Sequence, residues 1–252
     1  MYSKSNNFIK LLDSFASVSL PEMDCVKLMH RIDTKYVFNA MVLDKIFAKL
    51  QPYYKVLTIN GHRAFPYSTT YFDTPDFALY NQHQNGKLNR FKIRFRRYDA
   101  FGNSFMEIKL KTNKQRTQKK RHEITGKDNI SDDALNMIET ETGYKFSELQ
   151  KTLVNEFKRI TLVNNDFTER LTFDFNLSFK NENDREELSN IVIAELKQDK
   201  HSNISSFYSI MKDLGIRKLG VSKYCLGMVL LNPILKWNSF KPKMLQIKKA
   251  AI

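Results

Sequence analysis

Hydrophobic and polar residues alternate along several short segments of the chain, which is the pattern of a β-strand with one buried face. In residues 90–98, the even-numbered positions from Arg90 to Arg96 are all basic, and the positions between them are Phe91, Ile93 and Phe95. Four further segments carry charged residues on one face and mostly apolar residues on the other. The pattern therefore predicts five strands of one design, at residues 31–38, 90–98, 105–111, 170–177 and 191–197.

Three other segments have apolar residues at helical spacing. Residues 43–50 follow Asn39, which suits an N-cap, and residues 131–138 begin at Ser131 beside two acids. Residues 207–214 end at Gly215, which is well placed as a C-cap. Because no linker-like stretch separates these elements, we expect one domain over residues 1–235 and a frayed, basic C-terminal tail over residues 236–252.

Composition limits the class of protein. The chain has 252 residues, of which 42% are hydrophobic, so it is long enough to bury a single core. Only 8 glycines and 6 prolines, beside 19 phenylalanines, exclude a disordered or collagen-like chain. Lysine and arginine total 41 against 27 acidic residues, a net charge of +14, which predicts a polyanionic partner such as nucleic acid, an acidic membrane or phosphates.

The cysteines and apolar runs bear on the compartment. Cys25 and Cys225 lie far apart without a CxxC spacing, which argues against a disulfide framework or a zinc knuckle. The first residues contain no signal-peptide core, and the longest apolar stretch, residues 225–231, is too short to cross a bilayer. We therefore expect a soluble, cytoplasmic protein.

The charged faces suggest a binding site. A lone alternating strand is usually half-buried with its charges in water. Here, however, like charges follow one another at successive positions of a face, and isolated acids such as Glu107 and Glu195 lie among the bases. This combination indicates a site for phosphates and a divalent metal. A closed antiparallel β-barrel, with the charged faces inside and the apolar faces under flanking helices, would gather the strands into one site.

Six motifs resemble a known family. They are "RIDTKYVF", "YFDTPDFALY" with "GKLNRFKIRFRRY", "EIKLK" with "KKRHEI", "RLTFDFNL", "IVIAELK" and "KLGVSKYCLG". Their order and spacing, from about Arg31 to Gly227, resemble the VTC domain, the polyphosphate polymerase domain of the triphosphate tunnel metalloenzymes. The chain resembles a stand-alone, bacterial-type member. The resemblance implies an α+β fold whose closed, eight-stranded antiparallel tunnel transfers the γ-phosphate of ATP, or of another nucleoside triphosphate, to inorganic polyphosphate.

The same resemblance implies roles for individual residues. Residues matched to the family's catalytic positions are Lys35, Arg94, Arg96, Lys109 and Glu195. Residues matched to phosphate-binding positions are Arg121, Arg159, Arg170, Lys197, Lys218 and Lys223. Two features depart from the pattern. Many related tunnel enzymes begin with an E-x-E-x-K strand; the corresponding residues here are Arg31, Asp33 and Lys35, so a base replaces one of the two acids, and this favours the VTC branch. Lys218 is spaced differently from the expected upstream lysine.

Residue chemistry suggests a mechanism. Phosphoryl transfer needs mainly positioning and neutralisation of charge on phosphate oxygens. We expect Glu195 to hold Mn²⁺ or Mg²⁺, with Asp174 and Glu107 as alternative ligands. We also expect Asp33 to form a salt bridge that orients Lys35. His83, His122 and His201 are interpreted as surface or loop residues.

Other functions stay open at this stage. A nucleic-acid binder would explain the positive charge, but the aromatic residues alternate with the cations and so face away from them, and we expect no nucleic-acid partner. A tunnel triphosphatase would use the same residue types. A third alternative is a polyphosphate-binding module without turnover. A membrane protein that receives the polymer is a possible partner.

Overall fold

A large antiparallel sheet with helices on both of its faces makes this an α+β protein. The computed structural model describes residues 7–24, 31–98, 102–114, 117–124, 130–199 and 205–252. The sheet contains 11 strands, of which eight follow one another in the order β2-β11-β9-β8-β4-β5-β6-β7. These eight are β2 (Arg31–Asn39), β11 (Ile191–Asp199), β9 (Glu169–Lys180), β8 (Gln150–Asn164), β4 (Ala64–Asp73), β5 (Arg90–Tyr98), β6 (Asn103–Lys111) and β7 (Thr117–Ile124).

Three short strands complete the sheet. β3 (Tyr54–Leu57) pairs with β8 and, in parallel, with β1 (Ser17–Val18), while β10 (Arg185–Leu188) pairs with β9. All five strands predicted from alternation are present, and each lies within a strand of the eight. The alternation predicted them because one face of each strand is buried under helices and the other is charged.

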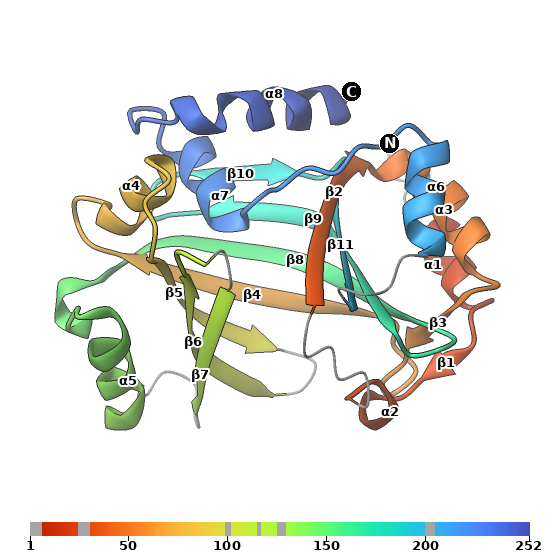
Figure 1. Ribbon diagram of the computed structural model, residues 1–252, viewed down its shortest axis with the longest axis horizontal. Coiled ribbons are helices and arrows are strands. Elements are labelled where there is room, and N and C mark those ends of the chain that lie inside the picture. The colour runs from red at the N-terminus through yellow and green to blue at the C-terminus, as the bar shows by residue number, and fades with distance from the viewer. Residues whose placement is uncertain (1–6, 25–30, 99–101, 115–116, 125–129, 200–204) are drawn as a thin grey trace.

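The sheet is strongly curved. The two end strands, β2 and β7, lie on the same side of the long strands β4 and β8 (Figure 1). Side chains of β2, β6 and β7 border one cavity, so the two ends of the sheet approach each other. Among the described residues, β2 and β7 do not pair with each other. The sheet that these residues form therefore has two ends and is not a barrel closed by hydrogen bonds. The free edge of β2 is instead covered at Tyr36 by a bridge to Lys218.

Two apolar layers cover the outer, convex face. Helices α1 (Asn7–Leu12), α3 (Leu43–Leu50) and α6 (Ser206–Asp213) pack with outward side chains of β2, β8, β9 and β11. Helix α5 (Asp132–Thr142) packs with β5, β6 and β7. The three predicted helices are thus confirmed. Ser131 caps α5 as predicted, whereas Asn39 caps the short 3₁₀ helix η1 (Ala40–Val42) that precedes α3.

Three helices cover one end of the inner, concave face. Helix α7 (Lys223–Leu231) packs against inward side chains of β8 and β9, beside α4 (Ala78–Gln84) and α8 (Lys241–Ala250) (Figure 1). The remaining elements are α2 (Leu20–Asp24), η2 (Phe146–Glu148) and η3 (Asn238–Phe240). No helix in the described residues has the length and hydrophobicity that crossing a bilayer requires.

The expectation that residues 236–252 fray is wrong. Residues 241–250 form helix α8, and its Met244 and Ile247 are buried in the same apolar cluster as α7. Their spacing of three residues puts both side chains on one face of the helix, while the lysines Lys241, Lys248 and Lys249 stay exposed. Burial of that apolar face is what orders the end of the chain.

Candidate functional site

Strand register gathers charged side chains on the concave face. Across β5 and β6, Arg94 lies opposite Glu107 and Lys92 lies opposite Lys109. Across β6 and β7, Glu107 lies opposite Arg121. Directly opposed residues on neighbouring strands point to the same face of a sheet. The alternation of each strand therefore places its charged residues on one shared surface, which we call the concave face.

The first cluster on the concave face centres on Glu107. This carboxylate is fully buried and contacts both Arg94, whose Nε donates to Oε2 at 2.7 Å, and the ammonium group of Lys119. Burial opposes ionisation of Glu107, but Arg94, Arg96 and Lys119 outweigh burial and lower its pKa to about 2. Glu107 is therefore an anion at neutral pH, and it holds Arg94 in place.

A second cluster centres on Glu195 of β11. Its Oε1 lies 2.7 Å from Nζ of Lys35, and its Oε2 lies 3.0 Å from Nζ of Lys197. Lys197 also contacts Asp33 at 3.0 Å. Burial opposes ionisation of Glu195, yet Lys35 and Lys197 hold its pKa well below the usual range. Asp33 forms a salt bridge, as expected, but the lysine that it contacts is Lys197, which lies opposite it across the two strands, whereas Lys35 contacts Glu195.

A third cluster joins β8, β9 and α7. Asp174 accepts two hydrogen bonds from Arg159, at 2.6 Å and 2.8 Å, and also contacts Nζ of Lys223. The ring of Phe157 lies 5.3 Å from the Arg159 guanidinium and 4.6 Å from Nζ of Lys223. Burial opposes ionisation of Asp174, but Arg159 and Lys223 lower its pKa overall. The bidentate pair fixes Arg159 in one orientation.

Lys109 and Arg96 pair with no carboxylate in the described part of the chain. Among the described residues, neither forms a salt bridge, and the one side-chain hydrogen bond of Arg96 goes to Thr69 at 3.3 Å. Arg94, then burial and Arg96, lower the pKa of Lys109 well below its usual value, while Glu195 opposes the shift. Burial, then Arg94, also lowers the pKa of Arg96. Enclosed cations that repel one another favour the binding of an anion.

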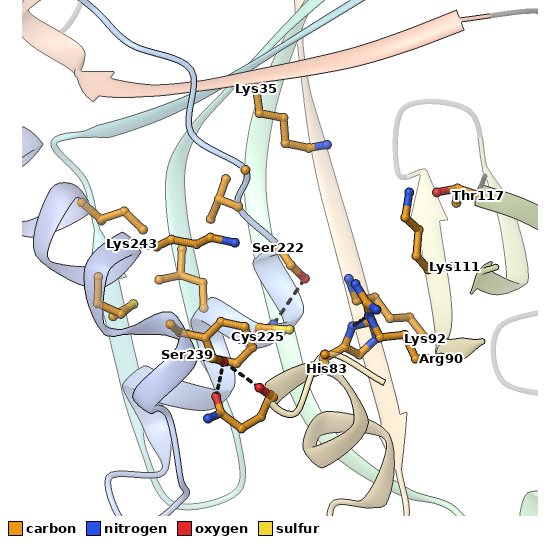
Figure 2. Close-up of a pocket in the computed structure, with 18 of the residues that line it drawn as sticks. Lys35, His83, Arg90, Lys92, Lys111, Thr117, Ser222, Cys225, Ser239 and Lys243 are labelled. Carbon is orange, nitrogen blue, oxygen red and sulfur yellow. Dashed lines mark hydrogen bonds between the residues drawn. The ribbon is translucent and has the colours of Figure 1, made fainter. Parts of the chain in front are cut away.

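A basic cavity of about 560 Å³ opens beside these clusters, next to α4, α7 and α8. Figure 2 shows Lys35, Lys92, Lys111 and Lys243 around this space, with His83 and Arg90 beside them. Asp33 is the only carboxylate among its described lining residues. A cavity of this size and charge suits a small, strongly anionic molecule.

His83 differs from its interpretation as a surface or loop residue. It lies on helix α4 and borders the basic cavity, where its Nδ1 is 2.9 Å from Nε of Arg90 and its Nε2 is 2.9 Å from the Phe91 carbonyl oxygen. Burial, then Lys92, lowers the pKa of His83 to about 3. The imidazole is therefore neutral and holds Arg90 at the cavity wall. His122 lies on β7, and His201 and Cys25 lie outside the described residues.

Most of the predicted site residues meet on the concave face. Lys35, Glu195 and Lys197 belong to one ion cluster, Arg94 belongs to a second, and Arg159 and Lys223 belong to a third. Lys109 lies within electrostatic reach of Arg94, Arg96 and Glu195. Arg170 lies opposite Lys197 on β9. Arg121 shares this face but is exposed, with its guanidinium 4.9 Å from the ring of Phe105.

Lys218 is not brought to the concave face. It is exposed and pairs through its backbone with Tyr36, whose side chain packs in the outer apolar layer. Lys35 and Tyr36 are neighbours in a strand and so point to opposite faces. Lys218 therefore borders a different cavity, together with Arg217 and Tyr208.

Some residues of the concave face were not assigned a site role from the sequence. Lys92 and Lys119 continue the alternation that predicted β5 and the hairpin after β6, so the same signal would have found them. Tyr71 and Thr69 on β4 lie opposite Arg94 and Arg96. Burial would raise the pKa of Tyr71, but Arg94 and Arg96 outweigh burial and lower it. Tyr71 and Thr69 are recognised as residues of the concave face only from the pairing of β4 with β5, which the sequence does not reveal.

The carboxylates of the concave face could bind a divalent cation only if a substrate supplied further oxygen ligands. Among the described residues, no three of His, Cys, Asp or Glu lie close enough to hold one ion. Glu195 is ionised, partly exposed and turned toward the cations that surround it. Mg²⁺ commonly takes one or two protein carboxylates and completes its shell with phosphate oxygens and water. Glu195 suits such an ion.

Several solved structures resemble the chain. They include a candidate adenylate cyclase from Bacillus halodurans, which is 13% identical, with 77% of this chain and 94% of that chain covered and a TM-score of 0.48. The PH1819 protein from Pyrococcus horikoshii is 14% identical, with 79% and 98% covered and a TM-score of 0.45. A candidate adenylyl cyclase from Hippeastrum with a dominant triphosphatase activity is 13% identical, with 79% and 95% covered and a TM-score of 0.48.

The family is shown by the sequence itself. No curated protein matches the chain. A family model of the VTC domain, however, matches residues 30–232. The match takes in all eight strands of the main sheet order and the three ion clusters of the concave face. The resemblance found in the six motifs is thereby confirmed, and the chain belongs to the VTC domain family.

Proposed function

We propose that the chain is a polyphosphate polymerase, which transfers the γ-phosphate of ATP or another nucleoside triphosphate to a growing inorganic polyphosphate. The observation that carries this proposal is the enclosed pair Lys109 and Arg96, which have no carboxylate partner in the described chain and lie beside Arg94. A chain of phosphates would supply the missing negative charge, and the curved sheet offers cations from strands on several sides of it.

In the proposed reaction, no covalent bond forms between the protein and a phosphate group. A terminal oxygen of the polyphosphate attacks the γ-phosphorus, the bond from that phosphorus to the β,γ-bridging oxygen breaks, and the nucleoside diphosphate leaves. The acceptor is longer by one phosphate. In this proposal, Arg94, Arg96 and Lys109 neutralise charge on the transferred group, and Arg159, Arg170 and Lys223 hold the acceptor. Arg121 and Lys197 contribute to the same positive surface.

A divalent ion, Mn²⁺ or Mg²⁺, would be held by Glu195. When bound, such an ion would neutralise negative charge on phosphate oxygens. The protein's own part is to keep Glu195 ionised, which Lys35 and Lys197 do. We further propose that β2 and β7, the two ends of the curved sheet, enclose the substrate in an eight-stranded tunnel.

The test is incubation with ATP and MnCl₂, followed by gel analysis of polyphosphate and by measurement of free phosphate. We expect long polymer from the unchanged chain, and at least 100-fold less from Lys109→Met. The matched control is Lys49→Met, which alters an exposed lysine on α3 and should keep full activity. Free phosphate without polymer would replace the proposal with a triphosphatase, and polyphosphate binding without turnover would replace it with a binding module.

A further inference from the structure

A second cavity lies outside the concave face, between helix α6 and the free edge of β2. It has a volume of about 620 Å³, and we call it the outer cavity. Its described lining consists of Tyr36, Tyr208, Met211, Lys212, Gly215, Ile216, Arg217 and Lys218. The volume is within the range of small-molecule sites. None of the residues given a role in the proposed polymerase reaction borders it.

The end of helix α6 explains why cations gather here. The backbone N–H of Gly215 donates to the Lys212 carbonyl oxygen at 3.0 Å, and the N–H of Ile216 donates to the Met211 carbonyl oxygen at 2.8 Å. Gly215 has a φ of +67°, which glycine adopts without strain. The chain therefore reverses directly after the helix and brings Arg217 back beside it.

The segment after the reversal is fixed to β2. Lys218 bridges Tyr36, and the N–H of Leu219 donates to the Lys35 carbonyl oxygen at 2.8 Å. Lys212 comes from α6, while Arg217 and Lys218 come from the segment that follows it. Three cations from two elements are thus held around one cavity.

These three cations have no carboxylate partner in the part of the chain that the structure describes. Among the described residues, none of Lys212, Arg217 and Lys218 forms a salt bridge, and the outer cavity is bordered by no carboxylate. All three are exposed. Like charges brought together without an acid between them lower the cost of binding an anion.

Two tyrosines give the outer cavity a second kind of surface. The ring of Tyr208 is 56% exposed, although Tyr208 lies next to Phe207, which is fully buried. The side chain of Tyr36 is 2% exposed, and its buried hydroxyl has no hydrogen-bond partner in the described structure. An exposed aromatic ring beside cations provides a surface for stacking a planar ring, and an unpaired buried hydroxyl provides a polar contact.

We propose that the outer cavity is a second anion-binding site, which takes a phosphate group joined to a planar ring, as in a nucleotide. Lys212, Arg217 and Lys218 would bind the phosphate, and Tyr208 would stack on the ring. This proposal rests on the outer cavity alone and does not require the chain to be a polymerase.

The test is photo-crosslinking with 8-azido-ADP, followed by peptide mass spectrometry. We expect labelling of peptides within residues 205–218 in the unchanged chain, and at least tenfold less labelling of these peptides in the double variant Lys212→Ala, Arg217→Ala. The control variant Lys45→Ala, Lys49→Ala removes two exposed lysines of α3 and should keep the label. Melting temperatures confirm that each variant folds.

Competition tests the chemistry of the ligand. Unlabelled ADP should suppress labelling of residues 205–218 at a concentration at least tenfold lower than either adenosine or inorganic tripolyphosphate, because each of these lacks one half of the proposed ligand. No label on this segment, or equal labelling of both double variants, would overturn the proposal. Tripolyphosphate that competes as well as ADP would overturn the stacking role of Tyr208. Polymer synthesis is measured separately, so that failure of either proposal is seen independently.

Discussion

Strand register selects the partners of Asp33 and Lys35 on the concave face, although Glu195 also contacts Lys197, two residues further along its own strand. Asp33 and Lys35 share a face of β2, but residues two apart in a strand are separated by about 6.6 Å, whereas directly opposed residues on neighbouring strands are about 5 Å apart. Asp33 therefore pairs with Lys197, and Lys35 pairs with Glu195. Alternation predicted which residues share the face, but the partners depend on which strands are neighbours.

Glu195 is the carboxylate on which metal binding would depend. We expect Glu195→Gln to lower the rate of polymer synthesis at least 100-fold, because a neutral amide neither holds a divalent cation nor balances Lys35 and Lys197. The matched control is Glu156→Gln, which changes a partly exposed carboxylate that pairs with Lys180 at 3.1 Å. Equal rates for the two variants, measured with ATP and Mn²⁺, would contradict the assignment.

Glu107 should make the fold sensitive to acid. Its pKa is about 2 in the folded protein, against 4.5 for an ordinary glutamate. A lowered folded-state pKa stabilises the protein above the ordinary pKa, and this contribution is lost as the pH falls from about 4.5 toward 2. Asp174 and Glu195 shift in the same direction. Urea midpoints measured from pH 7 to pH 3 should therefore fall steeply below about pH 4.5.

The variant Glu107→Gln isolates this contribution. At pH 7 we expect it to be less stable than the unchanged chain by about 3 kcal/mol, because Arg94 and Lys119 lose the anion between them. The difference should shrink as the pH falls below about 4.5, since Glu107 is then protonated in the unfolded state of the unchanged chain, which favours unfolding. A difference in the free energy of unfolding that stays constant down to pH 3 would contradict this explanation.

Elements with one buried face were predictable, and elements buried on more than one side were not. Helix α7 has seven of its nine residues buried, so it lacks a helical period of apolar positions. β8 and β4 form the middle of the sheet order, and both contain register shifts, between Glu156 and Lys158 and between Tyr71 and Phe72. A bulge moves the following side chains to the other face and interrupts the period of two.

Close packing of α7 on the sheet predicts an asymmetric response to two glycine substitutions. A Cβ at Gly227 would lie 2.6 Å from Cδ2 of Leu153 and 2.6 Å from Cδ1 of Phe179. We expect Gly227→Ala to destabilise the protein by about 1–3 kcal/mol, because α7 would have to move away from β8 and β9. Gly220→Ala is the control, since a Cβ there meets nothing within 4 Å. Urea titration of both variants makes the comparison, and equal stability of the two would contradict the packing argument.

At the scale of the whole molecule, curvature of the sheet creates the site. Lys109 on β6 and Glu195 on β11 belong to strands that are not neighbours in the sheet, yet each is within electrostatic reach of the other. Periodicity predicted a charged face for both strands. It did not predict how strongly the sheet bends, because bending depends on the twist of the central strands and on the helices packed outside. The family resemblance implies a closed barrel of eight antiparallel strands. The eight antiparallel strands are present in the described residues, but the two end strands, β2 and β7, are not paired with each other.

Binding of a polyanion should be accompanied by uptake of protons. Burial and neighbouring cations lower the pKa of Lys92, Lys109 and Lys223 in the protein without ligand. Phosphate oxygens beside these lysines would raise their pKa again, so protons are taken up as the ligand binds. Titration calorimetry of tripolyphosphate at pH 7.5, in two buffers with different ionisation enthalpies, measures this uptake. Uptake that is no larger for the unchanged chain than for Lys109→Met would contradict the shared environment of these lysines, because the two titrations differ only in the protein.

The edge strand β2 serves two surfaces through adjacent residues. Lys35 joins the ion pairs of the concave face, and Tyr36 packs edge-on against Phe207 at 5.3 Å in the outer apolar layer. Losing a single residue within 31–39 would exchange the two, which would push an ammonium group among phenylalanines and remove one of the two lysines that contact Glu195. Deletions and insertions in this strand should therefore be tolerated far less than substitutions. Protein engineering that changes the length of the chain should therefore avoid residues 31–39.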